Sequence, residues 1–165
     1  MRTSISIFFC FLLLGCISLS AADSLYHPKA NAEKEIATAI KKAKAENKHV
    51  LIQAGGNWCS WCLEFNRFTH ADFQLDSILR TNYVVCHLNY SDENKNYATF
   101  KKYGFPVRFG FPVFLILDGD GKLLHTQNSA YLEEGKGYSK ARVFEFLDNW
   151  RKDALNEKNY QWLKN

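Results

Sequence analysis

The spacing of hydrophobic and polar residues predicts a chain in which helices and strands alternate. Between residues 31 and 48, apolar side chains recur at intervals of three and four, as they do on one face of an amphipathic helix. The continuous apolar run at 50–52 instead predicts a strand covered on both faces, which is typical of a central parallel strand. The elements predicted in the first half are a helix over 31–48, a strand over 49–54, a helix starting around Cys59, and further helical turns over 72–80.

The second half of the chain continues this alternation and ends in a hairpin and a helix. We predict a strand over 83–88, a helix over 91–103 that ends at Gly104, a strand over 112–117, a turn over 118–121, and its hairpin partner over 122–126. After a loop to Tyr138, the last helix is predicted to start at Ser139 and to bury five residues at helical spacing: Val143, Phe144, Leu147, Trp150 and Ala154.

This order of elements predicts an α/β fold with a central mixed β-sheet. Alternating helices and strands followed by a hairpin give strands of both directions, with helices on both faces of the sheet. Hydrophobic residues make up 47% of the 165 residues, which is enough for a packed core. Because no repeat or long linker divides the chain, we expect residues 23–165 to form one domain and the protein to be a monomer.

Residues 1–22 are predicted to be a secretory signal peptide rather than part of this fold. Arg2 precedes an apolar run at 5–14, and the small residues Ser20 and Ala22 favour cleavage before the next residue. The apolar run is shorter than the ~20 residues that a membrane-spanning helix needs. We therefore expect an exported protein, either periplasmic or secreted.

A second way of processing the same segment stays open. Residues 13–16 resemble the lipobox of bacterial lipoproteins, in which the final cysteine, here Cys16, is lipidated. A lipid at this cysteine would make the protein a membrane-anchored lipoprotein instead of a free exported domain.

The charge balance argues against a nucleic-acid partner. The chain has 21 Lys and Arg residues against 17 Asp and Glu residues, and no basic stripe stands out. The lysines between 41 and 48 are spaced as on the solvated face of a helix. The expected macromolecular partners are therefore proteins.

Cysteine usage points to redox chemistry. Outside the predicted leader the chain keeps Cys59, Cys62 and Cys86, too few for a small scaffold stapled by disulfides. Cys59 is predicted to lie at a helix start, where unpaired N–H groups and the helix dipole favour its thiolate. Two intervening residues bring the Cys62 sulfur within disulfide distance, so that Cys59 can attack a substrate disulfide and Cys62 can resolve the mixed disulfide.

Other interpretations of these cysteines also stay open. Cys59 and Cys62 can form a permanent structural disulfide, or half of a zinc site with Cys86 and His87, although these last two residues are neighbours in a predicted strand and point to opposite faces. Cys86 alone is more typical of a buried apolar residue. The acidic run at 118–121 matches the start of a calcium loop, but a hairpin turn fits it better.

The segment from 50 to 62 resembles the thioredoxin superfamily motif, a buried strand followed by W-C-x-x-C. The family has a cis-proline before its third core strand, and Pro112 matches that position. The resemblance implies a thioredoxin-like fold and a thiol–disulfide oxidoreductase, close to the thioredoxin domains of periplasmic disulfide-interchange proteins. It implies no organic cofactor, and protein thiol or disulfide substrates together with a redox partner that the sequence does not name.

The same resemblance assigns roles to residues and shows where this chain departs from the family. Cys59 and Cys62 are the expected catalytic pair, and the residues expected to bind substrate are Trp58, Trp61, Phe111 and Pro112. Ser60 and Trp61 replace the Gly-Pro of thioredoxin, and Gln53 stands where thioredoxins have a buried Asp. The expected function is reduction of disulfides in exported proteins; the alternatives are a disulfide isomerase or oxidase, or a binding module without turnover.

Overall fold

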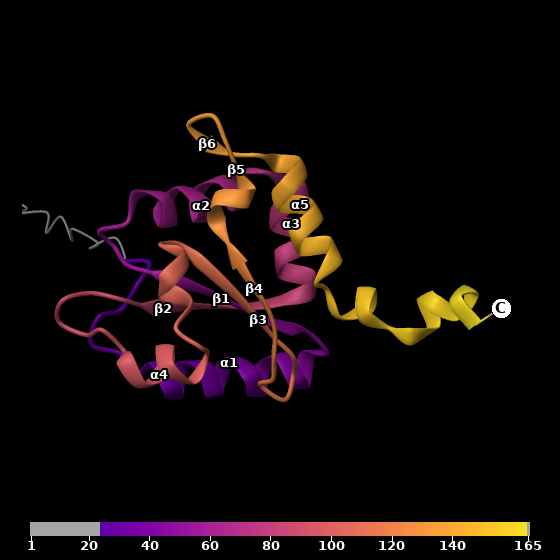
Figure 1. The fold of residues 1–165 in the computed structure, drawn as a ribbon, viewed down its shortest axis with the longest axis horizontal. Helices are drawn as coiled ribbons and strands as arrows, with labels where there is room; N and C mark the ends of the chain where they lie inside the picture. Colours follow the sequence, from indigo (N-terminus) through magenta and orange to yellow (C-terminus); the bar gives the residue numbers. More distant parts are fainter. Residues whose placement is uncertain (1–23, 165) are drawn as a thin grey trace, which may run out of the picture.

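The computed structural model describes residues 24–164, and their centre is a four-stranded sheet (Figure 1). The strands are β1 (His49–Gly55), β2 (Tyr83–Asn89), β3 (Val113–Leu117) and β4 (Leu123–Asn128), in the order β2-β1-β3-β4. β1 pairs with β2 in parallel and with β3 antiparallel, and β3 pairs antiparallel with β4. The predicted mixed sheet is confirmed. The signal peptide predicted at 1–22 and the alternative at Cys16 lie outside the described residues.

Helices cover both faces of this sheet. The helices are α1 (Ala32–Glu46), α2 (Ser60–Ala71), α3 (Phe73–Asn82), α4 (Tyr97–Lys102) and α5 (Lys140–Asn149). Figure 1 shows α1 and α4 on one face, and α2, α3 and α5 on the other. In the part of the chain that the structure describes, none of the helices combines the length and the apolar character needed to span a membrane.

The strand β1 is the centre of both cores, because every one of its residues is buried. Its alternate side chains point to opposite faces. Val50 and Ile52 pack in the cluster beneath α1, whereas Leu51 packs with α2, α3 and α5. The prediction of a strand covered on both faces is confirmed, and the end of this strand lies between the two layers of helices.

The helix predicted over 91–103 is shorter than expected, and its first half is a loop. Only α4 is helical. The amide of Asn94 donates to the carbonyl of Pro28 at 2.9 Å, and that of Asn96 donates to the carbonyl of Asn89 at 2.8 Å. Asn96 also adopts a left-handed backbone conformation with φ of 46°. Asparagine side chains compete with helical hydrogen bonds in this way, so the helix begins only after Asn96.

The aromatic residues of this region do not all face inward. Phe100 and Tyr103 are buried against α1, but Tyr97 is 66% exposed. With only six residues, α4 presents too little of a helical face to bury all three.

The C-terminal predictions also need correction. α5 ends at Asn149, so Ala154 lies beyond it in a 3-10 turn, η3 (Lys152–Leu155). Phe144 and Trp150 are only partly buried, and Phe146 takes a core position instead.

The segment predicted as a loop up to Tyr138 contains a 3-10 turn, η2 (Ser129–Leu132), and a two-stranded hairpin of β5 (Glu133–Glu134) and β6 (Gly137–Tyr138). Two further 3-10 segments are η1 (Pro106–Phe109) and η4 (Glu157–Lys164).

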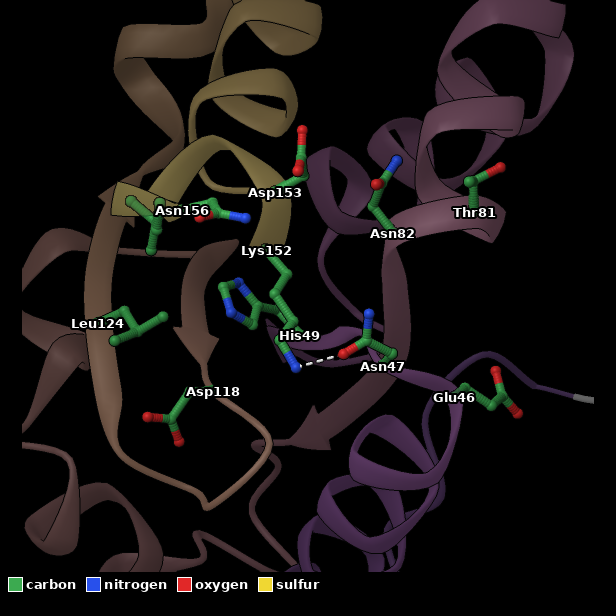
Figure 2. Close-up of a pocket in the computed structure, with 11 residues that line it drawn as sticks. Glu46, Asn47, His49, Thr81, Asn82, Asp118, Leu124, Lys152, Asp153 and Asn156 are labelled. Carbon is green, nitrogen blue, oxygen red and sulfur yellow. Dashed lines mark hydrogen bonds between the residues drawn. The ribbon is translucent and has the colours of Figure 1, made fainter. Parts of the chain in front are cut away.

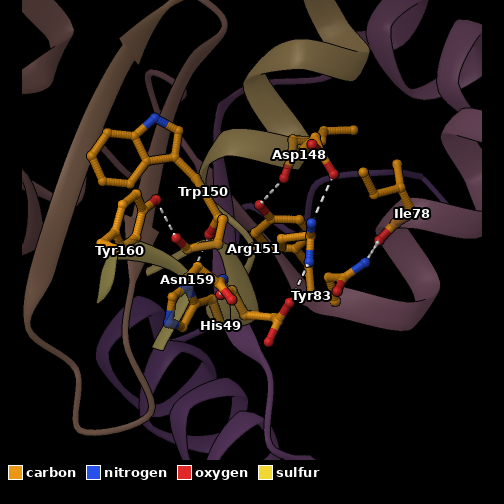
Figure 3. A network of polar contacts seen from close by, with 12 residues as sticks. His49, Ile78, Tyr83, Asp148, Trp150, Arg151, Asn159 and Tyr160 are labelled. Atoms are coloured by element: carbon orange, nitrogen blue, oxygen red, sulfur yellow. Dashed lines mark hydrogen bonds and ion pairs between the residues drawn. The ribbon is translucent and has the colours of Figure 1, made fainter. Parts of the chain in front are cut away.

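The end of the sheet where β1 begins is closed by the C-terminal segment. Figure 2 shows a pocket there, in which Lys152 donates to the side chain of Asn47 at 2.5 Å. In the network of Figure 3, the ring nitrogen Nδ1 of His49 lies 2.9 Å from the carbonyl of Trp150, and Arg151 bonds Asp148. Because His49 is the first residue of β1, this pocket is at the opposite end of the sheet from Cys59 and Cys62.

His87 is a polar residue held against the α2 face of the sheet. It pairs in register with Gln53 of the neighbouring strand, and its ring meets the Tyr26 ring edge-on at 5.4 Å between centroids. Its Nε2 atom is buried without a hydrogen-bond partner among residues 24–164. Burial lowers the pKa of His87 to about 4 from an ordinary value of 6.5. The imidazole is therefore neutral in the folded protein throughout the physiological range.

We predict that this histidine makes the protein less stable in mild acid. Between pH 6.5 and pH 4 the unfolded chain binds a proton at His87 that the folded chain does not. The free energy of unfolding should therefore fall as the pH falls through this window, by up to about 3 kcal/mol. Urea unfolding across this range should show that His87→Phe, which keeps a ring against Tyr26, loses much of this decrease. An equal pH dependence in both proteins would contradict the assignment.

Candidate redox site

Cys59 and Cys62 lie where β1 passes into α2. Cys59 is the N-cap of α2, and its sulfur accepts a hydrogen bond from the backbone N–H of Cys62 at 3.2 Å. The two residues form a disulfide, with their Cα atoms 5.2 Å apart. A group at this position faces the unpaired N–H groups and the positive dipole end of the helix, which favour negative charge on the sulfur. The structure therefore brings the two predicted cysteines together in the predicted local setting.

The two sulfurs differ in their surroundings. Cys62 is fully buried, whereas Cys59 keeps 5% of its surface. This is a narrow opening for a nucleophile, and the residues on either side of Cys59, Trp58 and Ser60, are exposed. Both cysteines pack with Tyr26 in a small cluster of their own, against which Trp61 and Phe111 are placed. Cys62 is thus the more shielded of the two cysteines.

An aromatic surface borders the disulfide on the side of Trp58. The Trp58 ring is 59% exposed, and its Nε1–H donates to the carbonyl of Tyr90 at 2.7 Å. It meets the Phe111 ring edge-on at 5.6 Å, and Phe111 in turn stacks on Tyr90 at 4.9 Å. The peptide bond between Phe111 and Pro112 is cis, and Pro112 is buried. Three segments distant in sequence therefore supply one apolar edge beside Cys59.

Trp61 lies differently from Trp58. It is partly buried and meets the Tyr138 ring edge-on at 5.4 Å, while the Tyr138 hydroxyl donates to the Trp61 carbonyl at 3.0 Å. Trp61 packs against both the cysteine cluster and the core beneath α2. Its side chain is therefore more a support for the first turn of α2 than part of the open aromatic edge.

Gln53 and Tyr26 are the polar side chains nearest the buried end of the site. The Gln53 amide donates to the Cys62 carbonyl at 2.8 Å, beneath the first turn of α2. Tyr26 comes from the segment before α1 and is fully buried. Its backbone N–H donates to the Asn57 side chain at 3.0 Å, and the Asn57 amide donates back to the Tyr26 carbonyl at 2.8 Å. These reciprocal hydrogen bonds tie the start of the described chain to the loop before Cys59.

Cys86 takes no part in this arrangement. It is buried on the face of the sheet covered by α1, whereas the disulfide lies on the α2 side. Burial raises the pKa of the Cys86 thiol to about 12, so it is a protonated apolar residue, as predicted. The zinc alternative needs Cys86 beside the disulfide, and the sheet separates them. Among residues 24–164, no three His, Cys, Asp or Glu side chains are grouped to hold a metal ion.

The acidic run at 118–121 forms a hairpin turn. The carboxylate of Asp118 accepts the backbone N–H groups of Asp120 and Lys122, each at 2.9 Å. Gly121 takes the left-handed conformation that such a turn requires, with φ of 83°. The Asp118 carboxylate thus stabilises the turn by accepting these two backbone N–H groups, and this role accounts for an acidic residue at position 118.

Tyr26, Asn57 and Tyr90 belong to this site but were missed by reasoning from sequence. Each lies in an irregular segment without the periodicity that marks a strand or helix. Asn57 adjoins the cysteine motif, so its position alone was a usable signal. Tyr26 and Tyr90 reach the site only through tertiary contacts, for which the linear pattern gives no sign.

Comparison with known proteins places this site in a family. The profile of the thioredoxin-like family matches residues 31–119, and no curated protein matches the chain. A disulphide isomerase from Xylella fastidiosa Temecula1 superposes with a TM-score of 0.68 at 21% identity, over 78% of this chain and 98% of its own. The C-terminal domain of Neisseria meningitidis DsbD in the oxidised form gives 0.54 at 18% identity, over 74% and 97%. These two structures share the fold. Since the family match spans more than half of the sequence and includes both cysteines, the chain belongs to the thioredoxin-like family.

Proposed function

We propose that the protein is a thiol–disulfide oxidoreductase that reduces disulfides in exported proteins. The observation that carries this proposal is the Cys59–Cys62 disulfide at the first turn of α2, in which Cys62 is fully buried and Cys59 keeps 5% of its surface. A permanent structural disulfide here would close a loop too short to stabilise the fold appreciably. The thioredoxin-like fold with this pair supports redox chemistry instead.

In the proposed reaction, the reduced protein donates two electrons to a substrate disulfide. The Cys59 thiolate attacks one substrate sulfur, and the other substrate sulfur leaves with the electron pair of the broken bond. Cys62 then loses its proton and attacks the Cys59 sulfur, which releases the second substrate thiol and restores the Cys59–Cys62 disulfide. Thiols and protons suffice for this cycle, so no organic cofactor is needed, but another redox partner must reduce the disulfide again.

The aromatic edge beside Cys59 is the proposed substrate surface. Trp58 and Phe111 present apolar rings next to the sulfur, and Pro112 sets the path of the chain behind them. An extended segment with apolar side chains around its disulfide would bury surface there. Trp61 contributes by supporting the helix start rather than by direct contact.

The burial of Cys62 withholds the thiolate stabilisation that makes a redox pair a strong oxidant. A thiolate is costly to form in an apolar cluster, so reduced Cys62 is a protonated thiol that gains no charge stabilisation. The reductase direction is proposed on this ground, whereas a stabilised thiolate at Cys59 acts in the opposite sense. Export is proposed from the leader pattern at 1–22, with lipid attachment at Cys16 as the alternative, and the protein is proposed to act as a monomer.

A second candidate is a binding module without turnover, which Gln53 favours. This amide cannot ionise, and it already bonds the Cys62 carbonyl, so it cannot take the proton that Cys62 must lose. Such a module would hold a partner through a mixed disulfide at Cys59.

An insulin assay distinguishes the two candidates. With dithiothreitol as the electron source, the wild-type protein should accelerate the reduction of insulin disulfides, and Cys59→Ser should not, because it lacks the attacking sulfur. Turbidity of the released insulin B chain measures the rate. No acceleration by the wild type over the Cys59→Ser control would support the binding module.

The direction of electron flow can be measured independently. Equilibration of the Cys59–Cys62 pair with glutathione buffers should give a reduction potential below the range of about −220 to −260 mV found for the cytosolic glutathione pool. Fluorescence of the neighbouring tryptophans or mass spectrometry after alkylation reports the oxidised fraction. A potential well above this range would identify an oxidase or isomerase instead.

The helix start should also make Cys59 acidic. In reduced Cys62→Ser, we expect the pKa of the Cys59 thiol to lie below the ordinary value of about 8.5, because the α2 N–H groups and dipole stabilise the thiolate. Ultraviolet absorbance of the thiolate against pH measures it, with Cys59→Ser as the blank. An ordinary or raised pKa would remove the basis for a nucleophilic role.

A further inference from the structure

We propose that the Tyr26 hydroxyl donates a hydrogen bond to the Cys62 sulfur while that sulfur is a thiolate, and thereby assists the resolving step. This inference rests on the proposed function, which it deepens by naming a residue that acts in one step of the reaction. Tyr26 lies outside the cysteine motif and outside the aromatic edge. It would be a positioning residue that donates a hydrogen bond to the buried Cys62 sulfur. Gln53 cannot ionise and therefore cannot act as a base for that sulfur.

The placement of the Tyr26 hydroxyl is the first observation behind this assignment. The side chain is fully buried in one cluster with both cysteines. A methyl group at Gly55 would overlap the Cys62 sulfur and would lie 2.8 Å from the Tyr26 hydroxyl. The hydroxyl and the sulfur therefore occupy neighbouring space over the same glycine.

The second observation is that the hydroxyl makes no hydrogen bond of normal geometry. It has no such partner among the described residues, although buried hydroxyls are nearly always paired. The Gln53 side chain is close enough to oppose the rise in the pKa of Tyr26 that burial causes, but it already donates to the Cys62 carbonyl. Leaving such a group unpaired is costly. The structure contains the disulfide, whose sulfurs are weak acceptors, whereas a thiolate accepts strongly. The hydroxyl thus has no strong acceptor in the oxidised form and gains one when Cys62 becomes a thiolate.

Tyr26 is also held firmly enough for this role. Its backbone exchanges two hydrogen bonds with Asn57, and its carbonyl also accepts from the Ser24 hydroxyl at 2.9 Å. Asn57 is two residues before Cys59, so the tyrosine and the redox pair are positioned by the same loop. The backbone of Tyr26 is therefore fixed beside the redox pair, and only its side chain has to adjust when the thiolate forms.

The other polar side chains near Cys62 already donate hydrogen bonds to backbone carbonyls. Gln53 donates to the Cys62 carbonyl, and the Tyr138 hydroxyl donates to the Trp61 carbonyl. The titratable groups that face this region are Cys59, Tyr26, Tyr138 and His87. The charges of His27 and His70 affect the pKa of His87, and those of Glu64 and Glu133 affect the pKa of Tyr138. Burial raises the pKa of Tyr26, so its hydroxyl keeps its proton and is a donor at neutral pH.

The proposed step is balanced without any further reactant. The Cys62 sulfur attacks the Cys59 sulfur, a new disulfide forms, and the bond from Cys59 to the substrate breaks with its electron pair on the substrate sulfur. The proton lost by Cys62 passes to water, or to the leaving sulfur when that sulfur is basic enough to hold it. Tyr26 keeps its own proton and only shares it with the Cys62 sulfur, which makes the thiolate easier to form.

The test uses 5,5′-dithiobis(2-nitrobenzoate), a small aromatic disulfide whose released thiolate is coloured. Attack by Cys59 releases one coloured thiolate, and resolution by Cys62 releases the second. Stopped-flow absorbance separates the two phases, and Cys62→Ser, which gives only the first, identifies them. All proteins are full-length and carry Cys10→Ser and Cys16→Ser, so that leader thiols do not react.

Tyr26→Phe removes only the hydroxyl, and Tyr103→Phe is the matched control. Tyr103 is also buried with an unpartnered hydroxyl, but it packs beneath α1 on the other face of the sheet. We expect Tyr26→Phe to slow the second phase about tenfold at neutral pH and to shift its pH profile upward, because the Cys62 thiolate loses a charge-assisted hydrogen bond. The first phase should stay within about twofold of wild type, and Tyr103→Phe should change neither phase.

Three results would overturn the assignment. The first is a second phase in Tyr26→Phe equal to that of wild type at every pH. The second is equal slowing of both phases, which would mean that the substitution distorts the site as a whole. The third is the same slowing in Tyr103→Phe. Insulin is absent from this experiment, so inactivity toward protein disulfides and failure of the Tyr26 assignment would be seen separately.

Discussion

The close approach of α2 to the end of β1 at Gly55 is the constraint on which the redox site depends. A side chain at this position would collide with the Cys62 sulfur, so only glycine lets the first turn of α2 pack onto the strand. This packing directs Cys62 inward and leaves Cys59 at the helix start. It also leaves room over the strand for the Tyr26 hydroxyl. The position of β1, covered by helices on both faces, therefore determines the geometry of the sulfurs.

The two sulfurs meet opposite electrostatic conditions within one helical turn. Helix N–H groups and the dipole favour charge on Cys59, whereas burial in an apolar cluster disfavours charge on Cys62. This asymmetry suits an ordered reaction in which one sulfur attacks first and the other follows. It also makes the second step the harder one, because Cys62 must become a thiolate within an apolar cluster. A nearby neutral donor lowers that difficulty without adding another buried charge.

Much of this arrangement could be predicted from the sequence, because it depends on local patterns. The apolar run at 50–52 and the spacing of the cysteines are both properties of neighbouring residues. The prediction of a helix over 91–103 was wrong for the first half of this range. The side chains of Asn94 and Asn96 donate hydrogen bonds to carbonyls elsewhere in the chain, which the local spacing of apolar residues does not reveal. Tyr26 and Tyr90 were missed for the same reason. What brings them to the site is tertiary packing between segments far apart in sequence.

Where thioredoxins have a buried Asp, this chain has Gln53, and it also has the Tyr26 hydroxyl beside the resolving sulfur. This difference has a chemical consequence. Burying a neutral hydroxyl costs far less than burying a carboxylate, so the apolar cluster around Cys62 stays compatible with a stable fold. A carboxylate can accept the proton of the resolving thiol, but the Tyr26 hydroxyl can only stabilise the resulting thiolate. The proton must then pass to water or to the substrate sulfur that leaves. Because the rate of displacement depends on the pKa of the leaving thiol, the substrate has a direct influence on the second step.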